Sequence, residues 1–226
     1  MEHDRSDRFA DLLLEGAARM GIAIPDPAVK RISVHRELLL RWSGKVNLTA
    51  VRDIKGMAER LYLDSCALLP YLKEACSLHD VGSGAGFPGL VLKAVQSEID
   101  LTLTEARRKK ISFLKEAARE MGFTRGVRVR WERIGIRAWR GEPAWQEVVS
   151  RASFPPKIWL DLGACLVAPG GRLWLMAGQP IEADEGLEQL VQPDCWPRGF
   201  ELELWTSYQL PFCGLGRRLA AFRRIP

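Results

Sequence analysis

The chain has 226 residues, of which 47% are hydrophobic and 27% charged, and its formal net charge is +5. This length suits one substantial core, and the composition is typical of a globular protein. No apolar run approaches the roughly 20 residues of a membrane helix, and the polar start argues against a secretory signal, so we expect a cytoplasmic protein. The five cysteines are odd in number and lack C-x-x-C spacing, so we expect no disulfide framework and no metal site.

The positive charge is concentrated in two parts of the chain. Residues 105–140 hold twelve lysines and arginines against four glutamates, and the segment after Pro211 adds four arginines and no acid. Residues 181–203 reverse the balance, with seven acids against one arginine. A basic face of this density favours a polyanionic partner such as RNA. A solvated surface that maintains solubility explains the charge about equally well.

The first part of the chain is predicted to be helical. Apolar residues recur at helix spacing, and Gly21 is a natural stop for the first helix. Asp26 is expected to cap the second helix, with Pro27 in its first position. The four expected helices run over Phe9–Met20, from Asp26 to about Trp42, from a cap at Asp53, and over Tyr62–Leu72. We expect residues 1–73 to form a helical region packed on a core of residues 74–226.

From about Leu78 the pattern changes to short apolar runs that alternate with amphipathic helices. Such alternation predicts βαβ units and a mostly parallel sheet. The final two strands have no long helix between them, so an antiparallel hairpin is expected at the sheet edge. The expected strands are Ser77–Val81, Ile99–Thr104, Val127–Trp131, Glu147–Val149, Arg172–Met176, Glu201–Gln209 and Leu219–Arg223, and the expected helices include Gly89–Val95 and Lys109–Met121.

The most informative segment is His79-Asp80-Val81-Gly82-Ser83-Gly84-Ala85-Gly86-Phe87-Pro88-Gly89, which ends the first strand and opens the next helix. Its spaced glycines let the backbone bend sharply and let a ligand lie against the main chain. Pro88 is expected in the first position of that helix. In open α/β sheets the ligand occupies the crevice beyond the carboxyl ends of the strands. The sequence therefore predicts a cofactor site here.

Two cofactor classes are compatible with this loop. Residues 84–89 satisfy the G-x-G-x-x-G template of dinucleotide enzymes, and Glu105 stands where an acid holds ribose hydroxyls in either class. S-adenosylmethionine is favoured because Asp80 begins the glycine register and can reach an ammonium group. Phe87 and Pro88 also make the turn bulky and remove an N–H that a pyrophosphate would use. An NAD-dependent oxidoreductase is the less favoured alternative.

At these residues the chain resembles a known family. The segment from Asp80 to Gly89 is similar to the signature of the bacterial 16S rRNA guanine-N7 methyltransferases (RsmG, also called glucose-inhibited division protein B). The resemblance covers nearly the whole chain, through Asn47-Leu48-Thr49-Ala50, Leu63-Asp64-Ser65, Ser150-Arg151-Ala152 and Pro169-Gly170-Gly171-Arg172-Leu173. It implies a Rossmann-like class I methyltransferase fold and S-adenosylmethionine as cofactor. It also implies a guanine N7 of 16S rRNA, in free RNA or in the small ribosomal subunit, as the methyl acceptor.

The glycine loop and the family resemblance together predict the residues of the site. The expected cofactor-binding residues are Asp80, Gly82, Ser83, Gly84, Gly86, Phe87 and Glu105. By resemblance, Arg151 faces the reaction site and positions cofactor or a phosphate. The expected RNA-binding residues are Asn47, Asp64, Ser65, Arg107, Arg108, Lys109, Lys110, Arg217 and Arg218. A packed polar turn explains Asp64 equally well. We expect a monomer that needs no metal.

Two further features bear on the assignment. The chain departs from the family pattern at Leu61, Gly135 and Ala177, and these departures keep open a non-catalytic or retargeted RNA-binding relative. Most of the eight tryptophans stand in apolar context, where core or surface packing is favoured over base stacking. The tryptophans in apolar context are Trp139, Trp145, Trp159, Trp174, Trp196 and Trp205.

Overall fold

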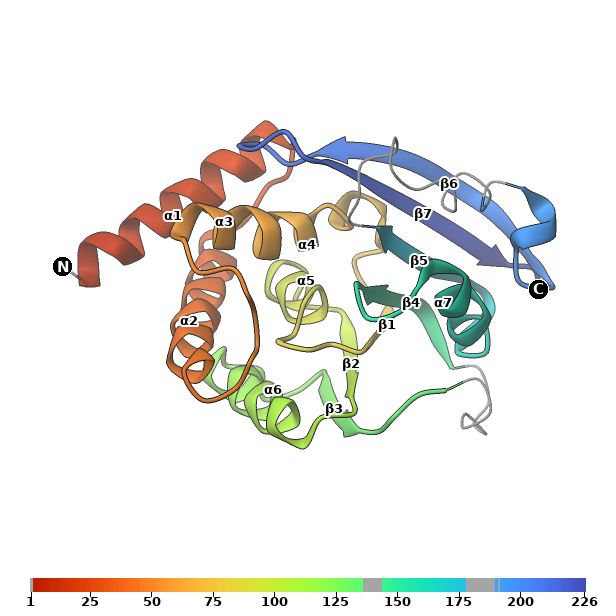
Figure 1. The fold of residues 1–226 in the computed structure, drawn as a ribbon, viewed down its shortest axis with the longest axis horizontal. Helices are drawn as coiled ribbons and strands as arrows, with labels where there is room; N and C mark the ends of the chain where they lie inside the picture. The colour runs from red at the N-terminus through yellow and green to blue at the C-terminus, as the bar shows by residue number, and fades with distance from the viewer. Residues whose placement is uncertain (1, 136–143, 178–189, 191) are drawn as a thin grey trace.

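A seven-stranded sheet forms the centre of the molecule, in the order β3-β2-β1-β4-β5-β7-β6. The computed structural model describes residues 2–135, 144–177, 190 and 192–226 (Figure 1). Strands β1 to β5 pair in parallel, whereas β7 runs antiparallel to both β5 and β6. The strands are β1 (Ser77–Val81), β2 (Asp100–Glu105), β3 (Val127–Trp131), β4 (Trp145–Arg151), β5 (Val167–Ala177), β6 (Phe200–Gln209) and β7 (Gly216–Arg224). The predicted fold class is confirmed.

Helices cover both faces of this sheet. The connections β1–β2, β2–β3 and β4–β5 contain α5 (Gly89–Val95), α6 (Arg108–Glu120) and α7 (Pro156–Gly163). The strand order reverses direction at β1, so right-handed crossovers place α5 and α6 on one face and α7 on the other. The buried residues form two clusters accordingly, one containing Phe113 of α6 and the other Trp159 of α7.

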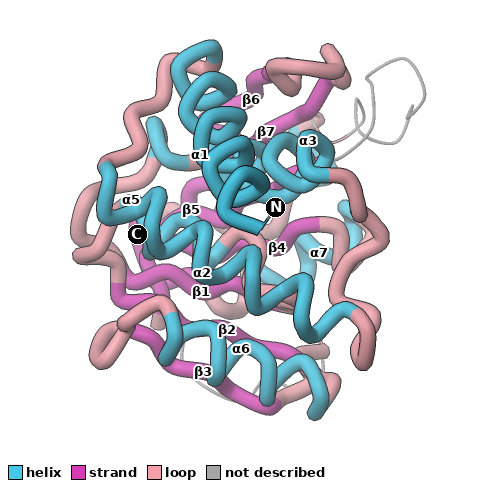
Figure 2. Tube along the Cα trace, turned by 90° about the vertical axis from the view of Figure 1, so that its left-hand side faces the viewer, coloured by secondary structure: helices cyan, strands magenta, loops and turns pink. Residues whose placement is uncertain are grey.

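The N-terminal helices form a further layer over α5 and α6. Helix α1 (Glu2–Arg19) contacts α2 (Asp26–Ser43), and α2 lies against both α5 and α6 (Figure 2). Phe9, Ile32 and Tyr62 are completely buried in the same cluster as Phe113. The predicted helical layer is therefore present, while the division of the chain at residue 73 stays a prediction. Within the part of the chain that the structure describes, every helix is too short or too polar to span a bilayer.

The start of α2 corrects one expectation. The sequence predicts Asp26 as its N-cap, but the cap is Pro25, in an extended conformation with φ −65° and ψ 150°. Asp26 is the first helical residue, and the cap makes no side-chain hydrogen bond. An acid in the first turn still stabilises the helix through the helix dipole. A related shift occurs at α5, where Pro88 is the N-cap rather than the first helical residue.

The third and fourth expected helices form one continuous run. As expected, Asp53 caps its start, because the Asp53 carboxylate accepts a 2.6 Å hydrogen bond from the Gly56 N–H. The run passes from α3 (Ile54–Met57) through a π-helix, η1 (Ala58–Leu63), to α4 (Asp64–Cys66). The separate helix over Tyr62–Leu72 was therefore wrong. Beyond Cys66 only a short 3₁₀ turn, η2 (Leu69–Tyr71), follows, since Pro70 has no N–H to continue the helix.

Candidate active site

The register of the sheet gathers three functional segments at one edge. Val81 of β1 lies opposite Thr104 of β2, and Asp80 lies opposite Val149 of β4. The glycine loop, Glu105 and Arg151 therefore all lie at the carboxyl ends of neighbouring parallel strands. This is the edge where open α/β sheets bind ligands.

The glycine loop needs its glycines for conformation and for space. Gly82, Gly84 and Gly86 have φ of +73°, +57° and +87°, a region that other residues rarely adopt. A Cβ at Gly82 would lie 2.6 Å from the Ser153 Oγ, and that hydroxyl donates a 2.9 Å hydrogen bond to the Gly82 carbonyl. This hydrogen bond links the loop to the segment after β4.

Asp80 lies beneath the loop and is completely buried. Its Oδ2 accepts a 2.9 Å hydrogen bond from the Gly89 N–H at the start of α5. Its Oδ1 has no hydrogen-bond partner among the described residues. Burial raises the pKa of this carboxyl to about 7. Asp80 thus holds the start of α5, and its contact with a cofactor ammonium group stays a prediction.

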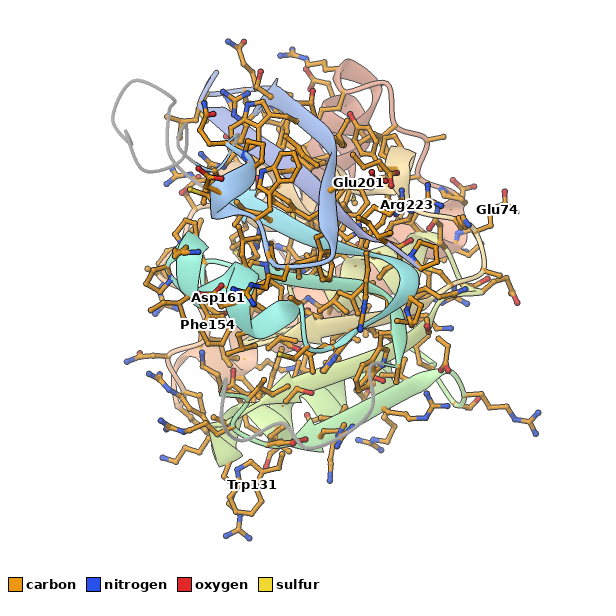
Figure 3. The ribbon with its side chains drawn as sticks, turned by 90° about the vertical axis from the view of Figure 1, so that its right-hand side faces the viewer. Glu74, Trp131, Phe154, Asp161, Glu201 and Arg223 are labelled. Carbon is orange, nitrogen blue, oxygen red and sulfur yellow. The ribbon has the colours of Figure 1, made fainter. Side chains whose placement is uncertain are left out.

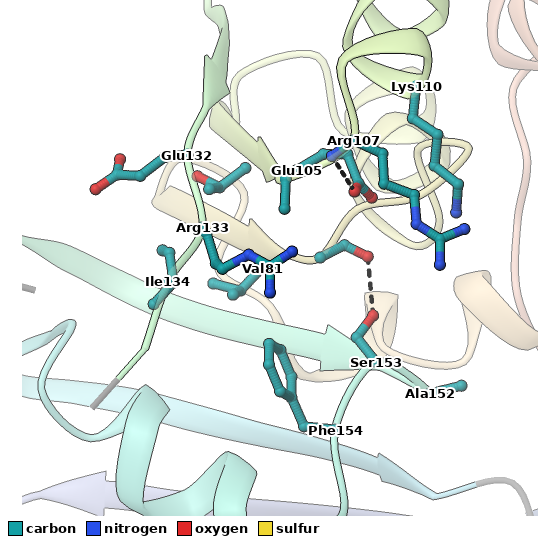
Figure 4. A pocket seen from close by; sticks show the side chains of 13 residues that line it. Val81, Glu105, Arg107, Lys110, Glu132, Arg133, Ile134, Ala152, Ser153 and Phe154 are labelled. Atoms are coloured by element: carbon teal, nitrogen blue, oxygen red, sulfur yellow. Dashed lines mark hydrogen bonds between the residues drawn. The ribbon is translucent and has the colours of Figure 1, made fainter. Parts of the chain in front are cut away.

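The first cavity has a volume of about 450 Å³ and opens beside Glu105 (Figure 4). The Glu105 carboxylate, which is 7% exposed, accepts hydrogen bonds from the Gly84 N–H at 3.1 Å and the Arg107 N–H at 2.8 Å. The walls combine apolar surface with charge. They consist of Val81, Gly82, Thr104, Glu105, Ala106, Arg107, Lys110, Glu132, Arg133, Ile134, Ala152, Ser153 and Phe154. A carboxylate beside apolar walls suits a nucleoside, whose ribose hydroxyls donate and whose base is flat.

A second cavity, of about 360 Å³, adjoins the first and shares Gly82, Lys110, Ala152 and Ser153 with it. The glycine loop forms one wall and the π-helix region forms another. Arg60, Arg151 and Arg217 add three guanidinium groups to the shared lysine. The remaining lining residues are Leu48, Thr49, Leu61, Asp64, Ser83, Gly84, Ala85, Phe87, Met176, Ala177 and Tyr208. This cavity therefore favours an anionic or electron-rich ligand.

Asp64 organises the cations of the second cavity. Its Oδ2 accepts a 2.9 Å hydrogen bond from Arg151, and its Oδ1 accepts from the Tyr208 hydroxyl at 2.8 Å and from Arg217 at 3.3 Å. The side chains of Asp64, Arg151 and Arg217 are only 9%, 14% and 11% exposed. Burial, together with the neighbouring Asp64, raises the pKa of Tyr208. One carboxylate thus joins residues that lie far apart in the chain.

Arg151 is held from several sides. Its guanidinium also donates to the carbonyls of Arg60 and Leu61 in the π-helix, at 3.1 and 3.3 Å. Its central carbon lies 5.2 Å from the centroid of the Phe87 ring, in a cation–π contact. π-helical turns often occur at functional sites, and this one directs backbone carbonyls at the arginine. Arg151 therefore has one fixed orientation.

His35 connects the helical layer to the glycine loop. Its Nδ1 lies 2.9 Å from the Tyr62 hydroxyl, and its Nε2 lies 2.9 Å from the Ala85 carbonyl oxygen. Burial lowers the pKa of His35 to about 4, so the ring is neutral near pH 7 and one nitrogen donates while the other accepts. Ala85 accepts, so Nε2 is the donor. Phe87 packs edge-on against both rings.

Comparison with known proteins decides the family. A sequence model of GidB, described as rRNA small subunit methyltransferase G, matches residues 29–191. The chain is 34% identical over 219 residues to the ribosomal RNA small subunit methyltransferase G of Myxococcus xanthus, covering 96% of this chain and 98% of that protein. The protein of the same name from an Azoarcus species is 36% identical over 218 residues, covering 96% and 97%. The chain belongs to the GidB family.

Solved structures agree with the fold of this GidB-family chain. A SAM-dependent methyltransferase from Aquifex aeolicus superimposes with a TM-score of 0.56 at 16% identity, covering 76% of this chain and 94% of that one. The 1,6-didemethyltoxoflavin-N1-methyltransferase of Burkholderia thailandensis, solved with S-adenosylhomocysteine, gives a TM-score of 0.58 at 14% identity, covering 90% and 92%. The sequence matches confirm the predicted family resemblance, and these structures support the fold alone.

The structure brings together only part of the predicted site. Gly82, Gly84, Glu105, Arg107 and Lys110 line the cavities, as do Ser83, Phe87, Asp64, Arg151 and Arg217. The other predicted residues, Asp80, Gly86, Asn47, Ser65, Arg108, Lys109 and Arg218, line neither cavity. Arg218 follows Arg217 on β7, and successive strand side chains point to opposite faces. Its guanidinium lies over the Trp205 ring instead.

Several lining residues of this GidB-family site were not predicted. Ser153 and Arg133 follow the carboxyl ends of β4 and β3, and the rule that ligands bind at this edge could have identified them. Tyr208 belongs to the antiparallel hairpin, whose register the sequence pattern does not reveal. Two of the three departures from the family pattern, Leu61 and Ala177, line the second cavity.

Proposed function

We propose that this protein transfers a methyl group from S-adenosylmethionine to N7 of a guanine in 16S rRNA. The observation that carries the proposal is the pair of adjoining cavities at the carboxyl edge of the sheet. One cavity contains the acid of β2, Glu105, and the other contains cations gathered around Asp64. The proposal applies to this chain the activity named for its family and relatives.

The residues of the first cavity fit the cofactor. Glu105 already accepts two hydrogen bonds from backbone N–H groups, and it would accept from the ribose hydroxyls in their place or beside them. Gly82 lies where the two cavities meet and Gly84 lines the second cavity, and the methionine part would lie along these two glycines. When bound, S-adenosylmethionine supplies an electrophilic methyl group on a sulfonium centre.

The second cavity would hold the guanine and an adjoining phosphate. Guanine N7 has a lone pair on the major-groove edge and loses no proton when it is methylated, so no general base is required. The lining agrees with this chemistry. Asp64 is occupied by its three hydrogen bonds, and the described lining residues include no histidine. Arg151 and Arg217 orient the acceptor, and the rate depends on alignment and exclusion of water.

The expected partners and location follow from this substrate. Exposed basic residues after β2, including Arg107 and Lys109, would contact phosphates of 16S rRNA or of the small subunit. A substrate of this kind supports a cytoplasmic location. We also propose that the protein acts as a monomer without metal. The described residues contain no group of three or more histidine, cysteine, aspartate or glutamate side chains arranged to hold an ion.

Two glycine variants test the assignment. Gly84 and Gly122 both have positive φ, so a leucine strains the backbone at either position. A Cβ at Gly84 extends into the second cavity, 3.7 Å from the Lys110 Nζ, whereas a Cβ at Gly122 meets nothing within 4 Å. We expect Gly84→Leu to abolish cofactor binding and transfer of labelled methyl to unmodified small subunits. Gly122→Leu should retain both. Equal effects of the two substitutions would contradict the proposed site.

A further inference from the structure

Trp131 is unusually exposed for its type. It ends β3 with 63% of its surface accessible, the largest exposed fraction of any large hydrophobic residue that the structure describes. Figure 3 shows its ring projecting away from the body of the protein. Tryptophan is normally buried over most of its surface, so a ring presented to solvent is open to contact by a partner.

The ring is nevertheless held in place. Its Nε1 donates a 3.1 Å hydrogen bond to the Ala106 carbonyl on the segment after β2. The central guanidinium carbon of Arg108 lies 5.6 Å from the ring centroid. The indole is therefore a rigid platform beside a cation, and its large exposed fraction leaves ring surface available to a partner.

The surroundings of this platform are basic and adjoin the cofactor cavity. Arg107, Arg108 and Lys109 are exposed on the neighbouring segment, and Arg133 is exposed two residues beyond the tryptophan. Arg107 and Arg133 also line the first cavity. A partner bound at Trp131 would thus lie beside the first cavity. Positively charged side chains would line the surface between the ring and that cavity.

We propose that Trp131 stacks an unpaired nucleobase of the RNA substrate while Arg108 and Lys109 contact adjoining phosphates. This inference rests on the proposed function and adds a docking site for single-stranded RNA at the rim of the catalytic cavities. Aromatic rings hold single strands in this way because every base has a flat face, so the contact tolerates sequence. The basic residues match the phosphates, which favours a nucleic acid over an apolar partner.

Equilibrium binding of an unpaired, dye-labelled oligoribonucleotide to the full chain tests the proposal. Replacing an aromatic residue that stacks one base by alanine weakens single-strand binding by about 5- to 100-fold. We therefore expect the affinity of Trp131→Ala for the oligoribonucleotide to fall by a factor in this range. Trp131→Phe should restore most of the affinity, because a flat ring remains. Ile225→Ala is the control, since Ile225 is 52% exposed and follows the end of β7, which four strands separate from β3 in the sheet. It should bind like the unchanged protein.

Salt dependence separates stacking from charge. Arg108→Ala should lower the slope of log K against log salt by about 0.7 for each phosphate that the arginine neutralises, whereas Trp131→Ala should leave the slope unchanged. Undiminished RNA binding by Trp131→Ala, or equal reductions in affinity for Trp131→Ala and Trp131→Phe, would overturn the stacking proposal.

Methyl transfer to small subunits distinguishes this inference from the proposed function. We expect Trp131→Ala to raise the KM for subunits about 10-fold, with kcat and the Kd for S-adenosylmethionine retained. A raised KM without any weakening of binding to free RNA would assign the platform to a protein component and overturn the inference. If the unchanged protein methylates no RNA, the proposed function itself fails.

Discussion

Removing the Asp64 carboxylate, which is paired with Arg151, should destabilise the protein far more than removing the Asp100 carboxylate, which is paired with Arg128 on the surface. Asp64 lies 2.9 Å from Arg151, with side chains 9% and 14% exposed. Asp100 lies 2.8 Å from Arg128, with side chains 44% and 65% exposed. The two ion pairs match in chemistry and distance, and they differ in burial and in the further partners of Asp64, which are Tyr208 and Arg217.

The expected magnitudes follow from that difference. Asp64→Ala leaves the charges of Arg151 and Arg217 and the hydroxyl of Tyr208 without their shared acceptor, which should cost about 3 kcal/mol. Asp100→Ala should cost less than about 1 kcal/mol, because water replaces the missing carboxylate. Urea unfolding at pH 7 with linear extrapolation measures both free energies. The reasoning is refuted if the two variants are destabilised by similar amounts.

Three further perturbations test other contacts. Burial raises the pKa of Asp80 to about 7, so between about pH 4 and pH 7 the folded chain keeps a proton that the unfolded chain has released. The stability from this group is complete below about pH 4 and is lost as the pH rises. The unfolding free energy of the unchanged protein relative to Asp80→Asn should therefore fall by about 2 kcal/mol from about pH 5 to pH 7, and a constant difference in urea unfolding would contradict the raised pKa of this buried carboxyl. Glu105→Gln should raise the Kd for S-adenosylmethionine about 10-fold in calorimetry, since a charged acceptor for the ribose is removed, and an unchanged Kd would remove Glu105 from the cofactor site. The Glu147 carboxylate, in a residue only 2% exposed, accepts hydrogen bonds from Arg172 and from the Trp174 Nε1. Glu147→Ala should therefore lower the unfolding free energy by about 3–5 kcal/mol, because it leaves the Arg172 charge without this partner. Glu203→Ala, which removes the outer partner of Arg172 at 3.5 Å, should cost less than about 1 kcal/mol.

The sequence pattern predicts the sheet well because its strands are short apolar runs with clear boundaries. The expected limits of β1, β3 and α5 coincide with the observed ones. Helical periodicity does not distinguish an α-helix from a π-helix, and the sequence pattern predicts two helices where the structure has one continuous run through η1. That run matters for function, since it presents the carbonyls that hold Arg151.

The site was predictable where it depends on strand ends and unpredictable where it depends on side-chain direction. Within the basic run after β2, Arg107 and Lys110 line the first cavity. Arg108 lies instead beside Trp131. The contact between Asp64 and Arg217 spans 153 positions and requires the register of the terminal hairpin. Apolar spacing alone does not specify that register.

The most direct test of the central claim is to map the methyl group on 16S rRNA. Small subunits that lack N7-methylguanine would be incubated with the purified protein and labelled S-adenosylmethionine, and the RNA would then be cleaved chemically at N7-methylguanine. The account predicts label at one guanine and a single new cleavage site that is absent with Gly84→Leu. Label without cleavage, or no label from a protein that binds the cofactor, would contradict the assignment of guanine N7.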